Sequence, residues 1–156
     1  MTLEIITATI TDLDEVCELF TLYLAFYQRP ASAEDVRAYL QERLTQGDAV
    51  IFLARWEGQA VGLAQLYPSF SSLALAKSWI LYDLYVLSSA RRRGVAEALL
   101  ERCRVLAQET GACELFLQTA KDNLPAQALY EKHGYQRDTE FYNYYLTVTP
   151  PTPHHD

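Results

Sequence analysis

The stretch WILYDLYVLSSARRRGVA, residues 79–96, contains the features that decide the fold. Residues 79–87 form an apolar run that predicts a strand, and residues 95–110 repeat apolar side chains at the spacing of a helix that stops at Gly111. The turn between them consists of Arg91, Arg92, Arg93, Gly94, Val95 and Ala96. Such a turn presents backbone N–H groups at a helix N-terminus and adds three guanidinium groups, so we predict that it binds a phosphate or pyrophosphate.

Other interpretations of the basic turn remain open from the residues alone. An arginine cluster is often a solvated loop, and a basic patch can contact nucleic acid. The net charge of −7 argues against nucleic-acid binding by the whole protein. The turn lacks the Gly-Lys-Ser/Thr ending of a Walker A loop and the G-x-G-x-x-G of a dinucleotide-binding fold.

The rest of the chain alternates between strand-like and helix-like patterns. Predicted strands cover residues 4–9, 49–55, 59–67, 79–87, 114–119 and 141–148, and predicted helices cover residues 13–27, 32–47, 95–110 and 124–133. Helix-starting caps are expected at Thr11 with Asp14 and at Ser32 with Asp35. This order predicts an α/β (α+β) sheet layered by helices, in which residues 79–119 form a right-handed parallel crossover.

Length and composition limit the class of protein. A chain of 156 residues, half of them hydrophobic, is expected to form one folded domain over residues 1–148 with a flexible tail at 149–156. Three widely spaced cysteines suggest free thiols rather than a disulfide framework or a zinc site. We therefore expect a cytoplasmic protein without a metal, a signal peptide or a membrane span.

A second segment narrows the function. Residues 123–135, NLPAQALYEKHGY, contain the pattern N-x-x-A-x-x-L-Y-x-x-x-G-aromatic about 30 residues after the R-x-x-G-x-A of the basic turn. Together these motifs closely resemble the GNAT superfamily of acetyl-CoA-dependent N-acetyltransferases, over nearly the whole chain. Residues 81–86, LYDLYV, look more narrowly like the polyamine and diamine acetyltransferase branch, although Tyr82 stands where a glutamate is expected.

The resemblance implies a fold and a donor site. The fold would be a central mixed, mostly antiparallel sheet of six to seven strands with a splayed parallel pair, flanked by about four helices. The basic turn would hold the pyrophosphate of acetyl-CoA, the backbone of Leu84, Tyr85 and Val86 would pair with the pantetheine arm, and Asn123 would hydrogen-bond that arm. A strand N–H near Leu84 would stabilise the developing oxyanion.

Two residues are predicted to carry the chemistry. Tyr130 is the expected general acid, because a phenol with a pKa near 10 can protonate a leaving thiolate whose acid has a pKa near 8.5. A primary amine is neutral in only about one molecule in a thousand at pH 7, a handicap of roughly 4 kcal/mol, so a base is needed. Asp83 is the candidate base, acting through a water, with a substrate-cation anchor as the alternative.

The acceptor is expected between the first two helices and the Asp83 strand, where Glu34, Asp35, Glu42 and Asp48 would attract a cation. Tyr23, Tyr27, Phe70 and Trp79 are predicted to form an aromatic wall there, or else part of the core. The leading hypothesis is transfer of acetyl to a small polyamine, diamine or amino-acid-like amine. The alternatives are a protein lysine or N-terminal acetyltransferase and a non-catalytic CoA-binding sensor. The aromatic segment at residues 141–146 predicts a homodimer.

Overall fold

The computed structural model describes residues 2–149. Clustering of contacts divides the chain into two compact units, one ending at Gln118 and the other beginning at Thr119. The tail predicted at residues 149–156 lies outside the described residues except for residue 149. Each unit is described by itself.

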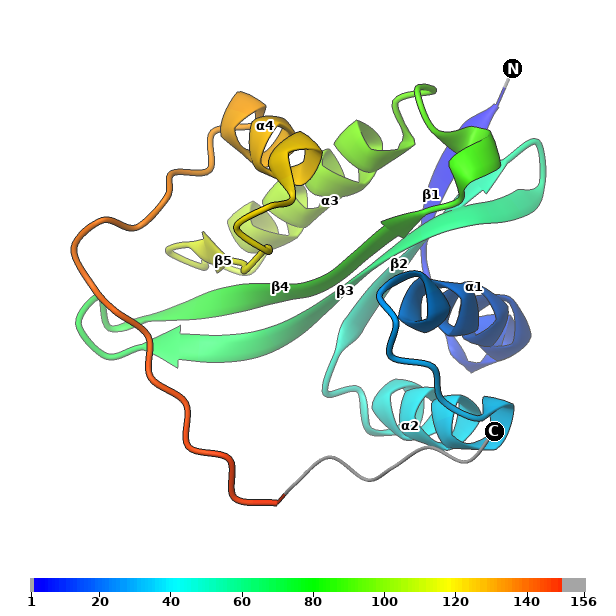
Figure 1. Cartoon of the computed structure of the whole chain (residues 1–156), viewed down its shortest axis with the longest axis horizontal. Coiled ribbons are helices and arrows are strands. Elements are labelled where there is room, and N and C mark those ends of the chain that lie inside the picture. The colour runs from blue at the N-terminus through cyan, green and yellow to red at the C-terminus, as the bar shows by residue number, and fades with distance from the viewer. Residues whose placement is uncertain (1, 150–156) are drawn as a thin grey trace. The chain divides into compact units, whose positions relative to one another are not determined.

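The first unit is built on one mixed sheet in the order β1-β2-β3-β4-β5 (Figure 1). Its strands are β1 (Leu3–Thr7), β2 (Val50–Trp56), β3 (Gln59–Ser71), β4 (Ala76–Val86) and β5 (Leu115–Phe116). The first four pair antiparallel, and β5 pairs parallel to β4 after the crossover through α3 (Val95–Glu109). The predicted parallel crossover is therefore confirmed, in a sheet of five strands rather than six or seven.

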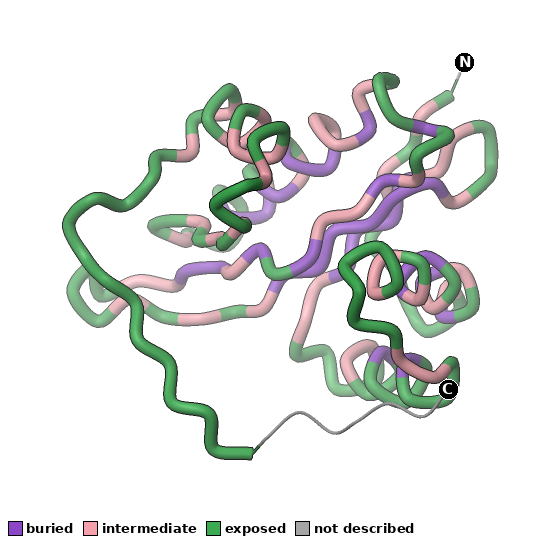
Figure 2. The backbone as a smooth tube through the Cα atoms, viewed as in Figure 1, coloured by how far each residue is buried: buried purple, intermediate pink, exposed green. Residues whose placement is uncertain are grey.

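Helices cover both faces of this sheet. The helices α1 (Leu13–Phe26) and α2 (Ala33–Gln46) pack against one face, and α3 packs against the other (Figure 1). The core under α1 and α2 is apolar and includes Val16, Leu40, Ile51, Leu53 and Leu63, all at most 1% exposed. Figure 2 shows the buried backbone concentrated in the middle of β2, β3 and β4.

Local sequence chemistry explains where several elements begin and end. The Ser32 hydroxyl accepts a hydrogen bond from the Asp35 N–H at 3.0 Å, which confirms the predicted N-cap of α2, and Gly47 ends that helix at φ 65°. The Glu57–Gly58 turn has positive φ at both residues, as a type I′ hairpin requires. Before α1, a capping box at the start of η1 (Ile10–Asp12) has Asp12 accepting from the Thr9 N–H at 2.8 Å. The α1 helix itself begins after Asp12 without a side-chain cap hydrogen bond, so the cap predicted at Thr11 and Asp14 is wrong.

The second unit contains α4 (Leu124–Lys132), which stops before Gly134 as predicted. The strand predicted at residues 141–148 is wrong, because these residues form no strand and Phe141, Tyr142, Tyr144 and Tyr145 are 74% to 90% exposed (Figure 2). Aromatic side chains favour strands only where a neighbouring strand completes the hydrogen-bond ladder. The described part of this segment has no such ladder.

Candidate active site

The candidate site is organised by a β-bulge in β4. Gln65 of β3 lies opposite Asp83, but the next residue of β3, Leu66, lies opposite Leu81, so Tyr82 is an extra residue in β4. A bulge bends its strand and changes the direction of the side chains that follow it. The bulge therefore sets where Asp83 points.

As a result, the alternation of side chains between the two faces of the sheet is reversed across the bulge in β4. Before the bulge, the Trp79 indole N–H donates to the Thr110 hydroxyl at 2.9 Å, at the end of α3. After it, the Tyr85 ring packs against Tyr23 of α1, with 5.8 Å between ring centroids. Trp79 and Tyr85 are six residues apart and would share a face in a regular strand.

This geometry corrects the predicted aromatic wall. Trp79 is 4% exposed and belongs to the α3 side, and Phe70 is 80% exposed. Tyr23 and Tyr27 do pack together, with 5.1 Å between ring centroids. The sequence could not place Trp79 on the α3 side, because the inserted residue Tyr82 reverses the alternation along β4.

Asp83 is buried at 5% exposure within this cluster. Burial raises the pKa of the Asp83 carboxyl, and hydrogen bonds from Gln65 and Tyr23 act in the opposite direction. The Gln65 side-chain N–H donates to Asp83 Oδ2 at 2.9 Å. Asp83 is thus a buried carboxyl group with a raised pKa, a property that recurs at sites of proton transfer.

Phenolic side chains surround the carboxyl group. The hydroxyls of Tyr39 in α2 and Tyr67 in β3 are 2.6 Å apart, and the Tyr67 ring makes an edge contact with Tyr82. Burial is the largest cause of a raised pKa at Tyr67, and Asp83 contributes to the same direction. Tyr67 therefore remains a neutral phenol, and the cluster combines aromatic faces with a single carboxyl group.

The acidic residues expected near the acceptor are partly neutralised. The Arg43 guanidinium contacts Asp48 at 2.9 Å and Glu42 at 3.2 Å. Glu34 and Asp35 are exposed in the first turn of α2. Among the described residues, Asp83 is the acidic side chain that is buried, and it lies on the side of the sheet that α1 covers.

The basic turn joins the same strand to α3. Arg91 donates to the Val86 carbonyl at 3.3 Å and lies over the Phe26 ring, while Arg93 lies over the Trp56 ring at 4.9 Å. Arg92 and Gly94 have positive φ, of 67° and 75°. Gly94 is the N-cap of α3 and makes no side-chain cap hydrogen bond. Because the N–H groups at the start of a helix have no acceptor within the helix, this turn has the form of an anion-binding helix N-terminus.

Close packing fixes this helix start on the sheet. A Cβ added to Gly62 of β3 would lie 3.2 Å from Val95 Cγ1, 3.0 Å from the Tyr85 carbonyl oxygen and 3.3 Å from Val86 Cγ2. Only glycine leaves room for the α3 N-terminus and the end of β4 to approach so closely.

The edge of β4 next to the turn is where the pantetheine arm is predicted to bind. Pairing between β4 and β5 is registered only at Trp79 with Leu115 and at Ile80 with Phe116, although β4 continues to Val86. The predicted splay of the parallel pair is consistent with this short pairing within the first unit. Leu84 and Tyr85 are half-buried there.

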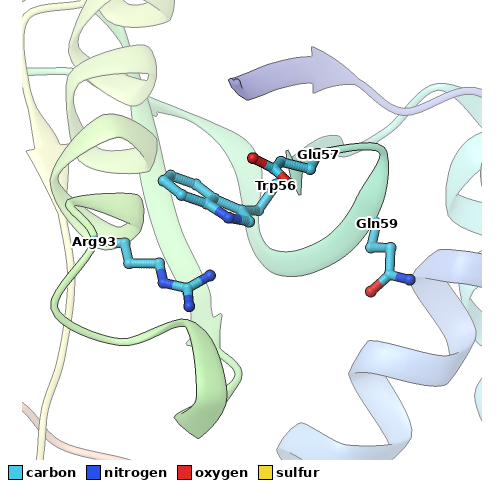
Figure 3. Close-up of a pocket in the computed structure, with 4 residues that line it drawn as sticks. All are labelled: Trp56, Glu57, Gln59 and Arg93. Carbon is cyan, nitrogen blue, oxygen red and sulfur yellow. The ribbon is translucent and has the colours of Figure 1, made fainter. Parts of the chain in front are cut away.

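An open pocket of about 630 Å³ lies beside the basic turn, lined by Trp56, Glu57, Gln59 and Arg93 (Figure 3). These residues come from the β2–β3 hairpin and the turn, and none belongs to the Asp83 cluster. We therefore place the candidate chemistry at Asp83 and not in this pocket.

Asn123 and Tyr130 lie in the second unit. The Asn123 side chain accepts from the Ala126 N–H at 3.3 Å and so caps α4, a role that the sequence analysis did not assign to it. The Tyr130 ring packs against Tyr135, with 5.8 Å between centroids. The structure brings together Asp83, Leu84, Tyr85, Val86 and the basic turn within the first unit; the roles of Asn123 and Tyr130 stay predictions.

Sequence reasoning missed Gln65 and Tyr67. Gln65 is fully buried, in a strand whose other central residues are apolar. A polar side chain in the middle of a buried strand was the available signal, because such a group needs a hydrogen-bond partner.

None of the helices in residues 2–149 combines the length and apolar character that crossing a bilayer requires. In the same part of the chain, no group of three or more His, Cys, Asp or Glu could hold a metal ion.

Comparisons with known proteins agree with this geometry. Residues 16–135 match the model of the acetyltransferase (GNAT) family. The chain is 38% identical to YhfO, an uncharacterized N-acetyltransferase of Bacillus subtilis (strain 168), over 90% of this chain and 95% of that protein. It is 29% identical to an N-alpha-acetyltransferase of Sulfurisphaera tokodaii, over 88% and 83%. A crystal structure of a probable acetyltransferase is 41% identical, with a TM-score of 0.91 over 95% of this chain and 99% of the other.

Proposed function

The chain belongs to the GNAT family of N-acetyltransferases, and on that premise we propose that it moves an acetyl group from acetyl-CoA to a small primary amine bound beside Asp83. The observation that supports this proposal is the buried Asp83 carboxyl group. The bulge in β4 positions it beside the part of β4 for which no pairing with β5 is registered. Acetyl-CoA would supply the acetyl group as a reactive thioester.

The basic turn supports the donor half of the proposal. Its N-cap residue is a glycine, which has no side chain to cap α3, and its three arginines are exposed. We propose that these groups bind the pyrophosphate, with backbone N–H groups giving direction and guanidinium groups giving charge. The edge of Leu84, Tyr85 and Val86 would pair with the amides of the pantetheine arm, and Asn123 would bind the same arm.

Asp83 supports the acceptor half. An ammonium group must lose a proton before its nitrogen can attack, and a carboxyl with a raised pKa is a stronger base than an ordinary aspartate. We propose that Asp83 removes this proton, directly or through a water. The aromatic rings of Tyr23 and Tyr67 next to it suit a cation on an aliphatic stem, as in polyamines and diamines.

Tyr130 is proposed as the general acid that protonates the departing thiolate. The Tyr130→Phe variant is expected to bind CoA in calorimetry and to lose turnover by two orders of magnitude or more, the usual size of general-acid catalysis. Tyr135→Phe removes the neighbouring phenol and is the matched control. Equal turnover of wild type and Tyr130→Phe would remove Tyr130 from this role.

The function is tested by incubating the protein with acetyl-CoA and a panel of polyamines, diamines and amino acids. Mass spectrometry identifies the acetylated amine, and thiol release is measured in parallel. Asp83→Asn should abolish turnover of any amine that the wild type acetylates, while CoA binding persists. CoA binding without any acetylated product would instead identify a CoA-binding sensor.

A second acceptor class is favoured by one comparison. The Sulfurisphaera tokodaii relative is an N-alpha-acetyltransferase by name, so protein or peptide N-termini, and lysine side chains, belong in the same panel as short peptides. Acetylation of peptides with no turnover of free amines would replace the small-amine proposal with this one.

We also propose a homodimer in the cytoplasm. The exposed aromatic segment that includes Phe141, Tyr142, Tyr144 and Tyr145 is a large apolar surface of the kind that a second copy covers. Three cysteines without a disulfide are typical of a reducing compartment. Sedimentation showing only monomer at micromolar concentration would contradict the dimer.

A further inference from the structure

The side chain of Gln65 is fully buried, yet one of its polar atoms lacks a hydrogen bond. It is 0% exposed, and its side-chain N–H donates to Asp83 Oδ2 at 2.9 Å. Its Oε1 is buried and has no hydrogen-bond partner among the described residues. A buried polar atom without a partner destabilises the folded protein, so its retention calls for an explanation.

We propose that Gln65 is a positioning residue whose amide turns over to hydrogen-bond Asp83 in both of its protonation states. With the amide as it stands, the N–H donates to the carboxylate. When the amide rotates by half a turn about its last torsion, Oε1 takes the place of the nitrogen and accepts from the protonated carboxyl. This inference rests on the proposed role of Asp83 as the base.

The unpartnered oxygen is what permits this rotation. An amide whose oxygen is held by another group is fixed in one orientation, whereas the torsion at the end of a glutamine is otherwise soft. Gln65 Oε1 has nothing to release before it turns. The bulge then matters directly, because it places Asp83 opposite Gln65 in the register.

The other groups facing Asp83 fit the same behaviour. Tyr23 of α1 hydrogen-bonds Asp83, and a hydroxyl, like an amide, both donates and accepts. The charge of Asp83 contributes to the raised pKa of Tyr67 in β3, and the Tyr67 hydroxyl is hydrogen-bonded to that of Tyr39 in α2. Arg43 of α2 interacts with Tyr39 and Tyr67 and is paired with acidic neighbours. A guanidinium bonded directly to Asp83 can only donate, so it would favour the charged carboxylate. An amide and a hydroxyl can each hydrogen-bond both the carboxylate and the protonated carboxyl group.

The proton balance of the step is simple. One N–H bond of the acceptor ammonium breaks, and one O–H bond forms on the Asp83 carboxyl group, directly or through a water. Gln65 turns its oxygen toward that new O–H, and Asp83 later releases the proton to solvent while Gln65 turns back. Gln65 itself neither gains nor loses a proton.

The test uses Gln65→Met, which has a similar size but cannot hydrogen-bond, and Gln65→Glu, which keeps the size and places a second carboxyl group beside Asp83. Because Gln65 would hydrogen-bond both protonation states, Gln65→Met should move the pKa of Asp83 by clearly less than the one pH unit or so expected on losing a fixed donor, and should lower stability both below and above that pKa. Like-charge repulsion should raise the pKa of Asp83 in Gln65→Glu. Ser78→Ala removes a buried polar group elsewhere in β4 and is the control. Thermal melting identifies variants that are folded.

Two readouts separate the outcomes. The first is the acid limb of the pH profile of kcat/KM with the best acceptor amine, which should stay close to its wild-type position in Gln65→Met and move to higher pH in Gln65→Glu. The second is a carboxyl carbon NMR titration of Asp83, assigned by its absence in Asp83→Asn, which needs no substrate. A rise of about one pH unit in the Asp83 titration of folded Gln65→Met would show a fixed donor and overturns the inference, as does unchanged stability of that variant on both sides of the titration. A wild type that turns over no amine refutes the proposed function alone, because the titration still decides the role of Gln65.

Discussion

Replacing Gly62 by alanine is expected to push the N-terminal turn of α3 and the end of β4 apart. The new methyl group would lie 3.0 Å from the Tyr85 carbonyl oxygen, 3.2 Å from Val95 Cγ1 and 3.3 Å from Val86 Cγ2. Ordinary van der Waals contacts of a Cβ lie between 3.4 and 4 Å, so these neighbours must give by a few tenths of an ångström.

The size of the effect follows from two opposing contributions. Extra volume in a packed interior costs about 1–3 kcal/mol, and loss of glycine freedom in the unfolded chain returns about 0.4–1 kcal/mol. The φ of Gly62 lies outside the left-handed region, so alanine adds no backbone strain there. The net destabilisation is about 1 kcal/mol, which at a urea m-value of about 1.5 kcal/mol/M lowers the unfolding midpoint by about 0.7 M.

Urea unfolding and CoA calorimetry measure the two consequences separately. Gly47→Ala is the matched control, because Gly47 sits at φ 65° after α2 with nothing within 4 Å, so alanine strains the backbone by about 1 kcal/mol far from the basic turn. Both variants should lose similar stability, and only Gly62→Ala should bind CoA several-fold more weakly. An unchanged urea midpoint for Gly62→Ala, or equal weakening of CoA binding by Gly47→Ala, would refute the reasoning.

Asp83→Asn should stabilise the protein more at pH 8 than at pH 4. The pKa of Asp83 is raised in the folded state, so between the unfolded and folded pKa values the native state holds a proton that the unfolded state has released. The contribution of Asp83 to folding stability is therefore full below its unfolded pKa near 3.9 and is lost as pH rises through the folded pKa. Urea midpoints at the two pH values check this, and an equal change at both would contradict it. Burial raises the pKa of the Cys103 thiol to about 12, so in native protein a thiol reagent should label the exposed Cys113 quickly and Cys103 only after unfolding. Arg55→Met should cost about 1 kcal/mol in thermal or urea unfolding, because Arg55 of β2 pairs with Asp12 and Glu15 near the start of α1 in a partly exposed ion-pair network. An unchanged unfolding midpoint would show that the network contributes little.

Elements that depend on local chemistry were predictable from the sequence. The cap at Ser32 and the end of α2 at Gly47 each follow from a few adjacent residues, and both are confirmed. Where two local patterns overlap, the sequence does not choose between them. Thr9 with Asp12 and Thr11 with Asp14 offer the same spacing, and the structure uses the earlier pair, at the start of η1.

Of the hydrogen-bonded pair Gln65 and Asp83 in the candidate site, only Asp83 could be predicted from the sequence. Asp83 could be named because its neighbours resemble a known motif, whereas its partner Gln65 depends on the pairing of two strands and on an inserted residue at Tyr82. Cross-strand register is a non-local property that no short window of sequence contains. The strand predicted at residues 141–148 failed for the same reason, because strand propensity does not supply the neighbouring strand.

The bulge at Tyr82 also limits where β4 tolerates a change of length. Trp79 before it faces the α3 side, whereas Asp83 and Tyr85 after it face the α1 side. Deleting Tyr82 would restore one regular alternation along the strand and turn either Trp79 or Asp83 to the other side of the sheet. One inserted residue thus lets nearby positions of a single strand serve two different layers of the fold.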